Sequence, residues 1–253
     1  MKSKGSGRVF AADPQRRDPA FIFDFGGVII DWDPRYLYRK LFDGDETCGS
    51  NLQNCSSNFE SCGSNLQSCG SNLQSCGSNL QAMERFLKEV DFYDWNSRQD
   101  EGRPFAEGVA ELCVRFPQYR DLIQAYDRRW DESIAGPYPE TVAILRSLRE
   151  MGYPLYGLSN WSVEKFLLVR HKYEVFDWFE TILLSGEVKI TKPDPRIFAL
   201  MLERIGREAS ECVLVDDSIA NVEAARQLGY QAIHFLSPEQ LQAELCQMEI
   251  SCG

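Results

Sequence analysis

Asp24 follows the short apolar run FIF (residues 21–23) and is followed, one residue later, by Gly26 and Gly27. Such a run predicts a buried strand, and open parallel sheets bind ligands at the carboxyl ends of their strands. Glycines let the backbone turn tightly and approach a ligand closely. We therefore expect Asp24 to be a site residue, with the two glycines lining the same site.

Polar residues also follow three later apolar runs. Ser159 and Asn160 come after PLYGL, Lys192 lies beyond TILLS, and Asp216 and Asp217 come after CVLV. The carboxyl ends of parallel strands share one edge of a sheet. These residues are therefore expected to meet the aspartate that follows the first strand.

These residue types suit phosphoryl transfer, which needs an in-line nucleophile and neutralisation of the phosphate charges. Asp24 could attack phosphorus and form an acyl phosphate. The carboxylates of Asp24, Asp216 and Asp217 would repel one another strongly without a cation. Together with the backbone carbonyl of Gly26, they would supply the oxygen ligands that Mg²⁺ prefers.

Ser159 and Lys192 are expected to contact the phosphate. The hydroxyl group could hydrogen-bond a phosphate oxygen, and the ammonium group could place positive charge on it while keeping Asp24 ionised. Other roles stay open from the residues alone. Lys192 could be a surface charge, Ser159 could cap the next helix, and Asp217 could cap a helix while Asp216 alone meets the metal.

The order of the predicted elements indicates an α/β fold. After a break at GPYP (residues 136–139), strand-like runs alternate with helical patterns, which predicts a doubly wound parallel sheet whose first strand is FIFDF. We expect residues 20–33 and 137–253 to form this core domain. Residues 34–136 have helical apolar spacing and are expected to form an inserted helical domain, and residues 1–19 to be disordered.

Residues 47–81 fall into five heptads, TCGSNLQ, NCSSNFE and three copies of SCGSNLQ. The spacing of Cys and Leu or Phe formally fits a coiled-coil seam. However, Gly, Ser and Asn are poor helix formers, and one Leu plus one Cys per heptad buries too little apolar surface to offset the ordering entropy. A disordered loop expanded by duplication is the favoured interpretation. The alternatives are a short ordered solenoid or helix, and a metal-binding tract, which the spacing of the cysteines opposes.

The stretch DWNSRQDEGRP (residues 94–104) is a polar, glycine-containing break inside the inserted domain. We interpret it as a solvated loop between helices. Its Trp95, Arg98 and Arg103 could alternatively touch an anionic or sugar substrate.

Four segments, FDFGGVIID, LSN, KPDPRIF and VDDSIANVEAA, occur in this order and resemble the successive motifs of the haloacid dehalogenase superfamily. The resemblance covers about residues 21–231 and is to the phosphatase-like subgroup, in which a helical cap lies between the first and second motifs. It implies a Rossmann-like core and the roles given above. The expected site residues are, for catalysis, Asp24, Ser159 and Lys192; for Mg²⁺, Asp24, Gly26, Asp216 and Asp217; and for the substrate, Gly27, Asn160 and Trp161.

The sequence departs from this family at Gly26. In most phosphatases that it resembles, the residue two after the nucleophile is a second aspartate, which protonates the leaving group. Such proton transfer is worth roughly 10²–10⁴ in rate. A water molecule, an acidic leaving group such as an acyl or anomeric phosphate, or a cap residue could cover the loss, and some relatives with glycine at this position look like working sugar phosphatases.

The favoured function is Mg²⁺-dependent hydrolysis of a small phosphomonoester, a sugar phosphate or similar metabolite, through an aspartyl-phosphate intermediate. A 2-haloacid dehalogenase remains an alternative, because it displaces halide from carbon and needs no acid at Gly26. Without a metal, however, Asp216 and Asp217 would carry uncompensated charge beside its anionic substrate. A third alternative is a catalytically weak binding protein whose repeat is the working surface.

The formal charge of −11 argues against nucleic acid or an anionic membrane as partner. No apolar stretch approaches the roughly 18 residues of a membrane span, and the first residues lack the apolar segment of a signal peptide. Five of the nine cysteines belong to the repeat and the others are unpatterned, which favours reduced thiols. We expect a cytoplasmic protein that binds a small phosphorylated molecule. The sequence indicates no oligomeric state.

Overall fold

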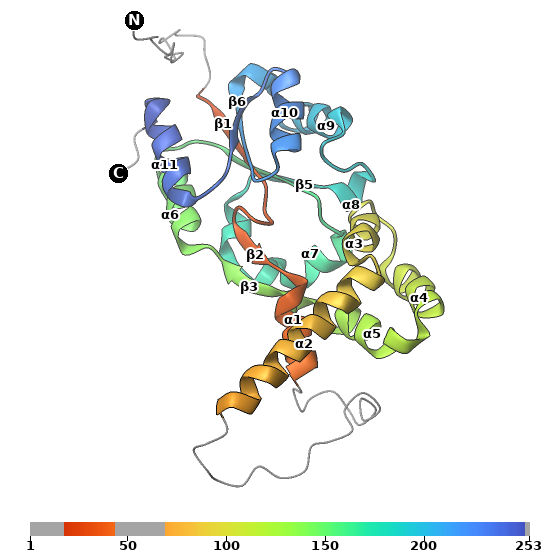
Figure 1. Cartoon of the computed structure of the whole chain (residues 1–253). Helices are drawn as coiled ribbons and strands as arrows, with labels where there is room; N and C mark the ends of the chain where they lie inside the picture. Colours follow the sequence, from red (N-terminus) through yellow and green to blue (C-terminus); the bar gives the residue numbers. More distant parts are fainter. Residues whose placement is uncertain (1–17, 44–68, 251–253) are drawn as a thin grey trace, which may run out of the picture. The chain divides into compact units, whose positions relative to one another are not determined.

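The structure is a computed structural model that describes residues 18–43 and 69–250, with residues 69–78 as backbone only (Figure 1). The described chain divides into two compact units. The first comprises residues 18–32, 97–104 and 135–250, and the second comprises residues 33–43, 69–96 and 105–134. Of the N-terminal segment expected to be disordered, only Asp18 and Pro19 are among the described residues.

A five-stranded sheet with the order β5-β4-β1-β6-β7 forms the centre of the first unit. All neighbouring strands are parallel. The chain runs outward from β1 to β4 and β5, then returns to β6 on the other side of β1, so the strand order reverses beside β1. The strands are β1 (Ala20–Phe23), β4 (Leu155–Ser159), β5 (Thr181–Leu184), β6 (Cys212–Asp216) and β7 (Gln231–His234).

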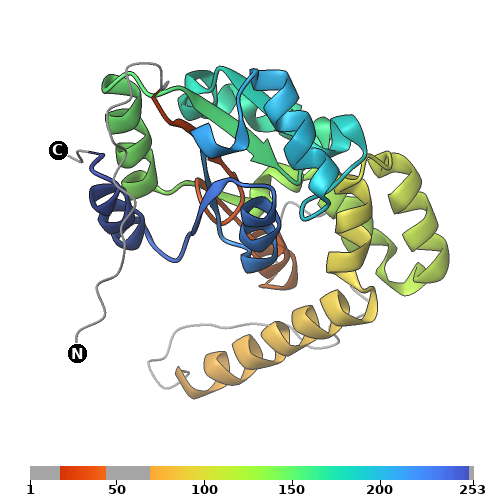
Figure 2. The ribbon, with the colours of Figure 1, turned by 90° about the horizontal axis from the view of Figure 1, so that it is seen from above.

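Helices lie between these strands and after the last of them, which confirms the predicted α/β alternation. They are α6 (Pro139–Glu150), α7 (Val163–Val169), α8 (Ser185–Val188), α9 (Pro195–Ile205), α10 (Ile219–Gln227) and α11 (Pro238–Gln247), with short 3₁₀ turns at Arg170–Lys172, Glu174–Trp178 and Ala209–Glu211. Ala20 and Ile22 alternate with the two phenylalanines of β1 and pack in one apolar cluster with residues of α9 and α10. In both views α6 (green) and α11 (blue) lie side by side (Figures 1 and 2).

A small two-stranded sheet pairs β2 (Ile30–Trp32) with β3 (Ile134–Pro137). The sequence did not predict it. The GPYP stretch indicates a break, and strands of three or four residues are too short to show an alternating apolar pattern. The chain then enters α6 after Tyr138, whose amide donates to the carbonyl of Ile29 at 2.8 Å.

The second unit is helical, as its apolar spacing predicted. Its helices are α1 (Pro34–Asp43), α2 (Cys69–Glu89), the first part of α3 (Phe92–Asp100), α4 (Phe105–Arg115) and α5 (Arg120–Arg128), with 3₁₀ turns at Pro117–Tyr119 and Trp130–Ser133. Its core is aromatic. The ring of Tyr38 lies 4.9 Å from that of Phe86, and the ring of Phe92 lies 4.8 Å from that of Tyr126.

The backbone is helical from Cys69 onward, so α2 includes almost all of the last two heptads. The expectation of a loop is therefore wrong for residues 69–81, whereas the first three heptads, residues 47–67, lie outside the described residues. The later part of α2 buries Met83 and Phe86 completely or nearly so. A helix nucleated by that packing extends at little cost, even through poor helix formers. None of the helices in the described part of the chain is long and apolar enough to cross a membrane.

Candidate active site

Asp24 directly follows β1, at the point where the strand order reverses. Its backbone amide donates to the carbonyl of Val215 on β6 at 2.9 Å, which fixes the residue to the sheet edge. Its side chain is buried, and its Oδ1 accepts a hydrogen bond of 2.7 Å from the amide of Phe25. The predicted placement of this aspartate at the carboxyl end of a buried strand is confirmed.

Lys192 is buried between two of the expected carboxylates. Its Nζ lies 2.9 Å from Oδ2 of Asp24 and 2.7 Å from Oδ2 of Asp216. It also donates to the backbone carbonyl of Leu158 at 2.8 Å. These three acceptors match the three hydrogens of an ammonium group. The alternative that Lys192 is a surface charge is wrong, because its residue exposure is only 4%.

Asp216 is the last residue of β6, and Asp217 follows it directly. The Oδ1 of Asp216 accepts from the amide of Ser218 at 2.9 Å and from Nδ2 of Asn221 at 2.8 Å. One carboxylate oxygen from each of the three aspartates lies within 4.8 Å of the others. The N-cap of α10 is Ser218 and has no side-chain cap hydrogen bond, so the alternative that Asp217 caps this helix is wrong.

The two glycines after Asp24 differ in their surroundings. Gly27 has a φ of +72°, and a Cβ placed on it would lie 2.3 Å from Oδ2 of Asp217. Glycine is therefore required at residue 27, where the backbone passes directly beside that carboxylate. A Cβ on Gly26 would have nothing within 4 Å. The loop is closed by hydrogen bonds from Ile30 to the carbonyl of Phe25 and from Gly27 to the carbonyl of Ile30, and neither uses the carbonyl of Gly26.

Burial and charge shift the pKa values of these groups. Desolvation raises the pKa of Asp24 from 3.8 to about 6, because it outweighs the attraction of Lys192, and Asp216 adds repulsion. Burial opposes the charge of Lys192, but the two carboxylates outweigh it and raise the pKa of that ammonium. Asp217 is exposed as a residue, yet desolvation of its carboxyl group, followed by repulsion from Asp216, raises its pKa.

The three carboxylates and one ammonium leave an excess of negative charge that suits a divalent cation. Ligands at about 2.1 Å from Mg²⁺ are at most about 4.2 Å apart, so oxygens within 4.8 Å of one another need only small movements to share one ion. The donor set is all oxygen, which also fits this ion. The residues that would hold it are Asp24, Asp216 and Asp217, with the carbonyl of Gly26.

Ser159 and Asn160 follow the neighbouring strand β4. Ser159 is buried at the end of that strand, and it does not cap α7, because the N-cap of that helix is Ser162. The side chain of Asn160 donates to the carbonyl of Lys192 at 2.9 Å and accepts from its amide at 2.8 Å. This reciprocal pair commits the Asn160 amide group to the backbone of the lysine, a positioning role that the substrate-binding prediction did not include.

Trp161 lies in an aromatic cluster of the first unit. Its ring contacts those of Phe25 at 6.2 Å and Phe166 at 5.4 Å, and its residue exposure is 6%. These contacts give Trp161 a packing role and lend no support to the expected substrate contact. Asn221, in contrast, was missed. Its position inside the VDDSIANVEAA segment, between apolar residues of a predicted helix, is a signal that could have marked it as buried.

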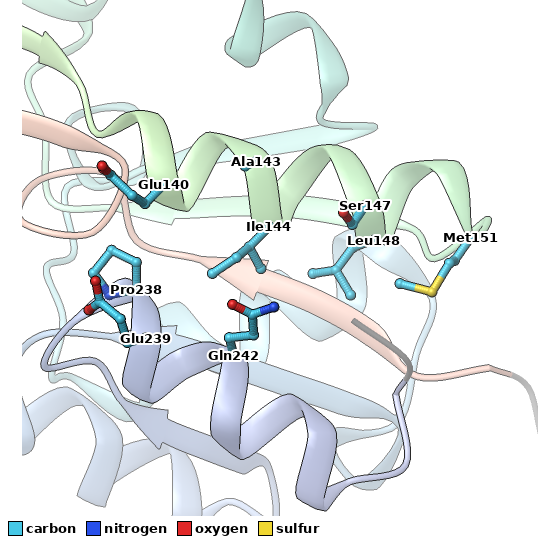
Figure 3. A pocket seen from close by; sticks show the side chains of 9 residues that line it. All are labelled: Glu140, Ala143, Ile144, Ser147, Leu148, Met151, Pro238, Glu239 and Gln242. Atoms are coloured by element: carbon cyan, nitrogen blue, oxygen red, sulfur yellow. The ribbon is translucent and has the colours of Figure 1, made fainter. Parts of the chain in front are cut away.

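A groove of about 270 Å³ lies between α6 and α11, away from these residues. Figure 3 shows Ile144 and Leu148 of α6 facing Gln242 of α11 across it. None of its nine lining residues is basic, whereas Glu140 and Glu239 are acidic. An anionic ligand such as a phosphate ester would be repelled there. The groove is therefore not the candidate active site.

A model of the haloacid dehalogenase-like hydrolase family matches residues 19–229. The chain belongs to this family. The match confirms the resemblance of the four motifs, and the protein is an enzyme of this hydrolase family with its α/β core.

Curated relatives of this hydrolase family include both phosphatases and dehalogenases. A phosphoserine phosphatase of Thermus thermophilus is 34% identical over 136 residues, 52% of this chain and 52% of that protein. A haloacetate dehalogenase of Moraxella sp. is 33% identical over 95 residues, 38% of this chain and 42% of that protein. The chain spans about half the length, or less, of the curated relatives it matches.

A solved structure shares the fold. A haloacid dehalogenase family enzyme of Bacteroides thetaiotaomicron, in complex with magnesium and inorganic phosphate, has a TM-score of 0.56 and 24% identity, and the match covers 86% of this chain and 93% of that one. At this identity, the likeness concerns the fold alone.

Proposed function

We propose that this hydrolase cleaves small phosphomonoesters with Mg²⁺ through an aspartyl-phosphate on Asp24. The observation that carries the proposal is the cluster at the sheet edge, in which three carboxylates approach within 4.8 Å and Lys192 pairs with two of them. A dehalogenase would bring an anionic substrate to this excess negative charge without a cation. The phosphoserine phosphatase among the relatives supports the same substrate class.

Asp24, Lys192 and Ser159 have separate roles in the proposed reaction. Asp24 attacks phosphorus through a carboxylate oxygen, and the ester oxygen leaves. Lys192 favours the ionised form of that carboxylate and so opposes the effect of burial, since their atoms are 2.9 Å apart. Because its three hydrogens already have acceptors, Lys192 acts on the phosphate mainly through its charge or by sharing one of these hydrogen bonds. Ser159, buried at the end of β4, would donate its hydroxyl hydrogen to a phosphate oxygen.

Bound magnesium would neutralise phosphate charge during this transfer. Water then hydrolyses the acyl phosphate and regenerates Asp24. Gly26 offers no acid or base for either step, so the proposed substrate has a leaving group that departs without strong protonation, such as an anomeric or acyl phosphate. We assign the choice of substrate to the helices of the second unit, in the role of the cap predicted for residues 34–136.

The experiment compares two reactions of the purified protein. Hydrolysis of p-nitrophenyl phosphate is measured with Mg²⁺ and with EDTA, and chloride release is measured from chloroacetate and 2-chloropropionate. The aryl ester is chosen because its leaving group scarcely needs protonation. We expect magnesium-dependent release of nitrophenol, no chloride, and a phosphorylated peptide containing Asp24 after acid quenching.

Two variants test the nucleophile. Asp24→Asn should abolish turnover, whereas Asp177→Asn, at an exposed carboxylate paired with Arg170, should keep it. Chloride release that is insensitive to EDTA would instead identify a dehalogenase. Substantial phosphatase activity in the Asp24 variant would refute the assignment of the nucleophile.

A further inference from the structure

Residues 97–104 lie, along the sequence, between two parts of the second unit, but they belong to the first. The interpretation of residues 94–104 as a solvated loop is wrong for residues 94–100, which belong to α3. Residues 97–100 are the last residues of α3, and Gln99 is completely buried. The stretch therefore has specific contacts within the first unit.

Asp100 makes two of these contacts. Its Oδ1 accepts a hydrogen bond of 3.0 Å from the amide of Ser162. Its backbone carbonyl accepts a hydrogen bond of 2.5 Å from Oγ of Ser185. The Oγ of Ser185 in turn accepts a hydrogen bond of 3.0 Å from the amide of Trp161. Asp100 thus holds two successive amides of the loop after β4, one directly and one through Ser185.

Two glycines let the backbones approach at this point. A Cβ on Gly102, which has a φ of +94°, would lie 2.8 Å from the carbonyl oxygen of Gly186. A Cβ on Gly186 would lie 3.0 Å from the carbonyl oxygen of Trp161. Three chain segments therefore pack backbone against backbone, at the carboxyl ends of β4 and β5.

The loop held by Asp100 leads straight to the reacting groups. Asn160, one residue before Trp161, clamps the backbone of Lys192 with two hydrogen bonds. The Nζ of Lys192 contacts Asp24 and Asp216. A displacement of the loop would therefore move both Ser159 and the lysine relative to the nucleophile.

We propose that Asp100 is a positioning residue, which fixes residues 159–162 as the phosphate-binding loop and, through Asn160, fixes Lys192. This inference rests on the function proposed above. Small displacements of positioned groups are costly in catalysis, up to about 100-fold for roughly 1 Å. The loss of the Oδ1 acceptor leaves the amide of Ser162 without the hydrogen bond that anchors the loop.

Asp100→Ala should lower kcat/KM for p-nitrophenyl phosphate by roughly 10- to 100-fold. Asp100→Asn keeps an acceptor oxygen at the same place and should retain most of the activity, because the role needs the hydrogen bond rather than the charge. Glu101→Ala removes the exposed neighbouring carboxylate and is the matched control, with unchanged kinetics expected. All rates are measured well below the unfolding temperature of each variant.

Amide hydrogen exchange gives a readout that is independent of turnover. In Asp100→Ala the amides of Trp161 and Ser162 should exchange faster, while the amides of β1 and β6 keep their protection. Ser185→Ala breaks the second link and should reproduce both effects more weakly, so it replaces Asp100→Ala if that variant does not fold.

The outcomes separate the two hypotheses. A wild-type protein that releases chloride rather than phosphate refutes the proposed function. In that case the kcat/KM values of the Asp100 variants relative to wild type are measured with chloroacetate instead, because residues 159–162 lie beside Asp24 whichever substrate is used. Positioning by Asp100 is overturned if Asp100→Ala turns over the working substrate as fast as wild type. It is also overturned if Asp100→Asn loses as much activity as Asp100→Ala, or if the wild type catalyses neither reaction.

Discussion

Replacement of Asp24 by Asn should change how the stability of the metal-free protein depends on pH. Burial raises the pKa of this carboxyl group from 3.8 to about 6. Between these pH values the folded protein retains a proton that the unfolded chain has released. Stability therefore falls as the pH rises through this window, and the loss amounts to on the order of 3 kcal/mol once both states are ionised.

The assay is urea unfolding in EDTA at pH values from about 4 to about 7, for the wild type and for Asp24→Asn. Asn has nearly the shape of the protonated acid but does not titrate. The two proteins should be similarly stable at the lowest pH, and the wild type should be less stable by on the order of 3 kcal/mol near neutrality. Asp177→Asn, at an exposed site, should follow the wild type throughout.

Magnesium provides the second arm of this test. A cation that binds only the folded state stabilises it by about 2.7 kcal/mol at a concentration of 100 times its Kd. This gain should be larger for the wild type than for Asp24→Asn, which has lost one of three carboxylates. If the difference between the two metal-free proteins does not vary with pH, or if the wild type gains stability over the variant as the pH rises, the reasoning is refuted. The attraction of Lys192 would then equal or outweigh the cost of burial.

Three further predictions follow from the glycines and the repeat. Gly27→Ala should weaken Mg²⁺ binding in calorimetry and cost about 1–2 kcal/mol of stability, because φ is +72° and the new Cβ would clash with Asp217. Gly26→Ala, with open space at its Cβ, is the control and should bind Mg²⁺ normally. Gly26→Asp should accelerate hydrolysis of alkyl phosphates more than of aryl phosphates, and equal gains on both would contradict its role as an acid. Deletion of residues 47–81 should leave urea unfolding nearly unchanged, since Asn79, Leu80 and Gln81, the residues of the repeat whose side chains the structure describes, are not buried; a loss of several kcal/mol would show that the heptads pack.

The sequence predicted the sheet and the position of the site because the relevant signals are local. The strands β1, β4 and β6 are short apolar runs that end in a polar residue or are followed directly by one, and parallel strands must bring those ends to one edge. Asp24, Lys192 and Asp216 could therefore be expected to meet. In the structure, Nζ of Lys192 lies 2.9 Å from Oδ2 of Asp24 and 2.7 Å from Oδ2 of Asp216.

What the sequence could not predict depends on pairings between distant residues. The clamp between Asn160 and Lys192 spans 32 residues, and the hydrogen bond from Ser162 to Asp100 spans 62. Neither leaves a pattern in either segment, because one polar residue in a loop has many potential partners. The helix through the last heptads was mispredicted for a different reason, since packing further along the same helix overrode local propensity.

The contrast between the two glycines bears on the chemistry of the site. Gly27 is dictated by packing, because only a residue without a Cβ allows Asp217 to approach its backbone. Gly26 is not, because the space around it would accept a side chain. The fold therefore does not require glycine at residue 26, two residues after the proposed nucleophile. Under the proposed phosphatase function, a leaving group that needs protonation would take its proton from water or from a cap residue, so we expect the rate to depend on the acidity of the leaving group.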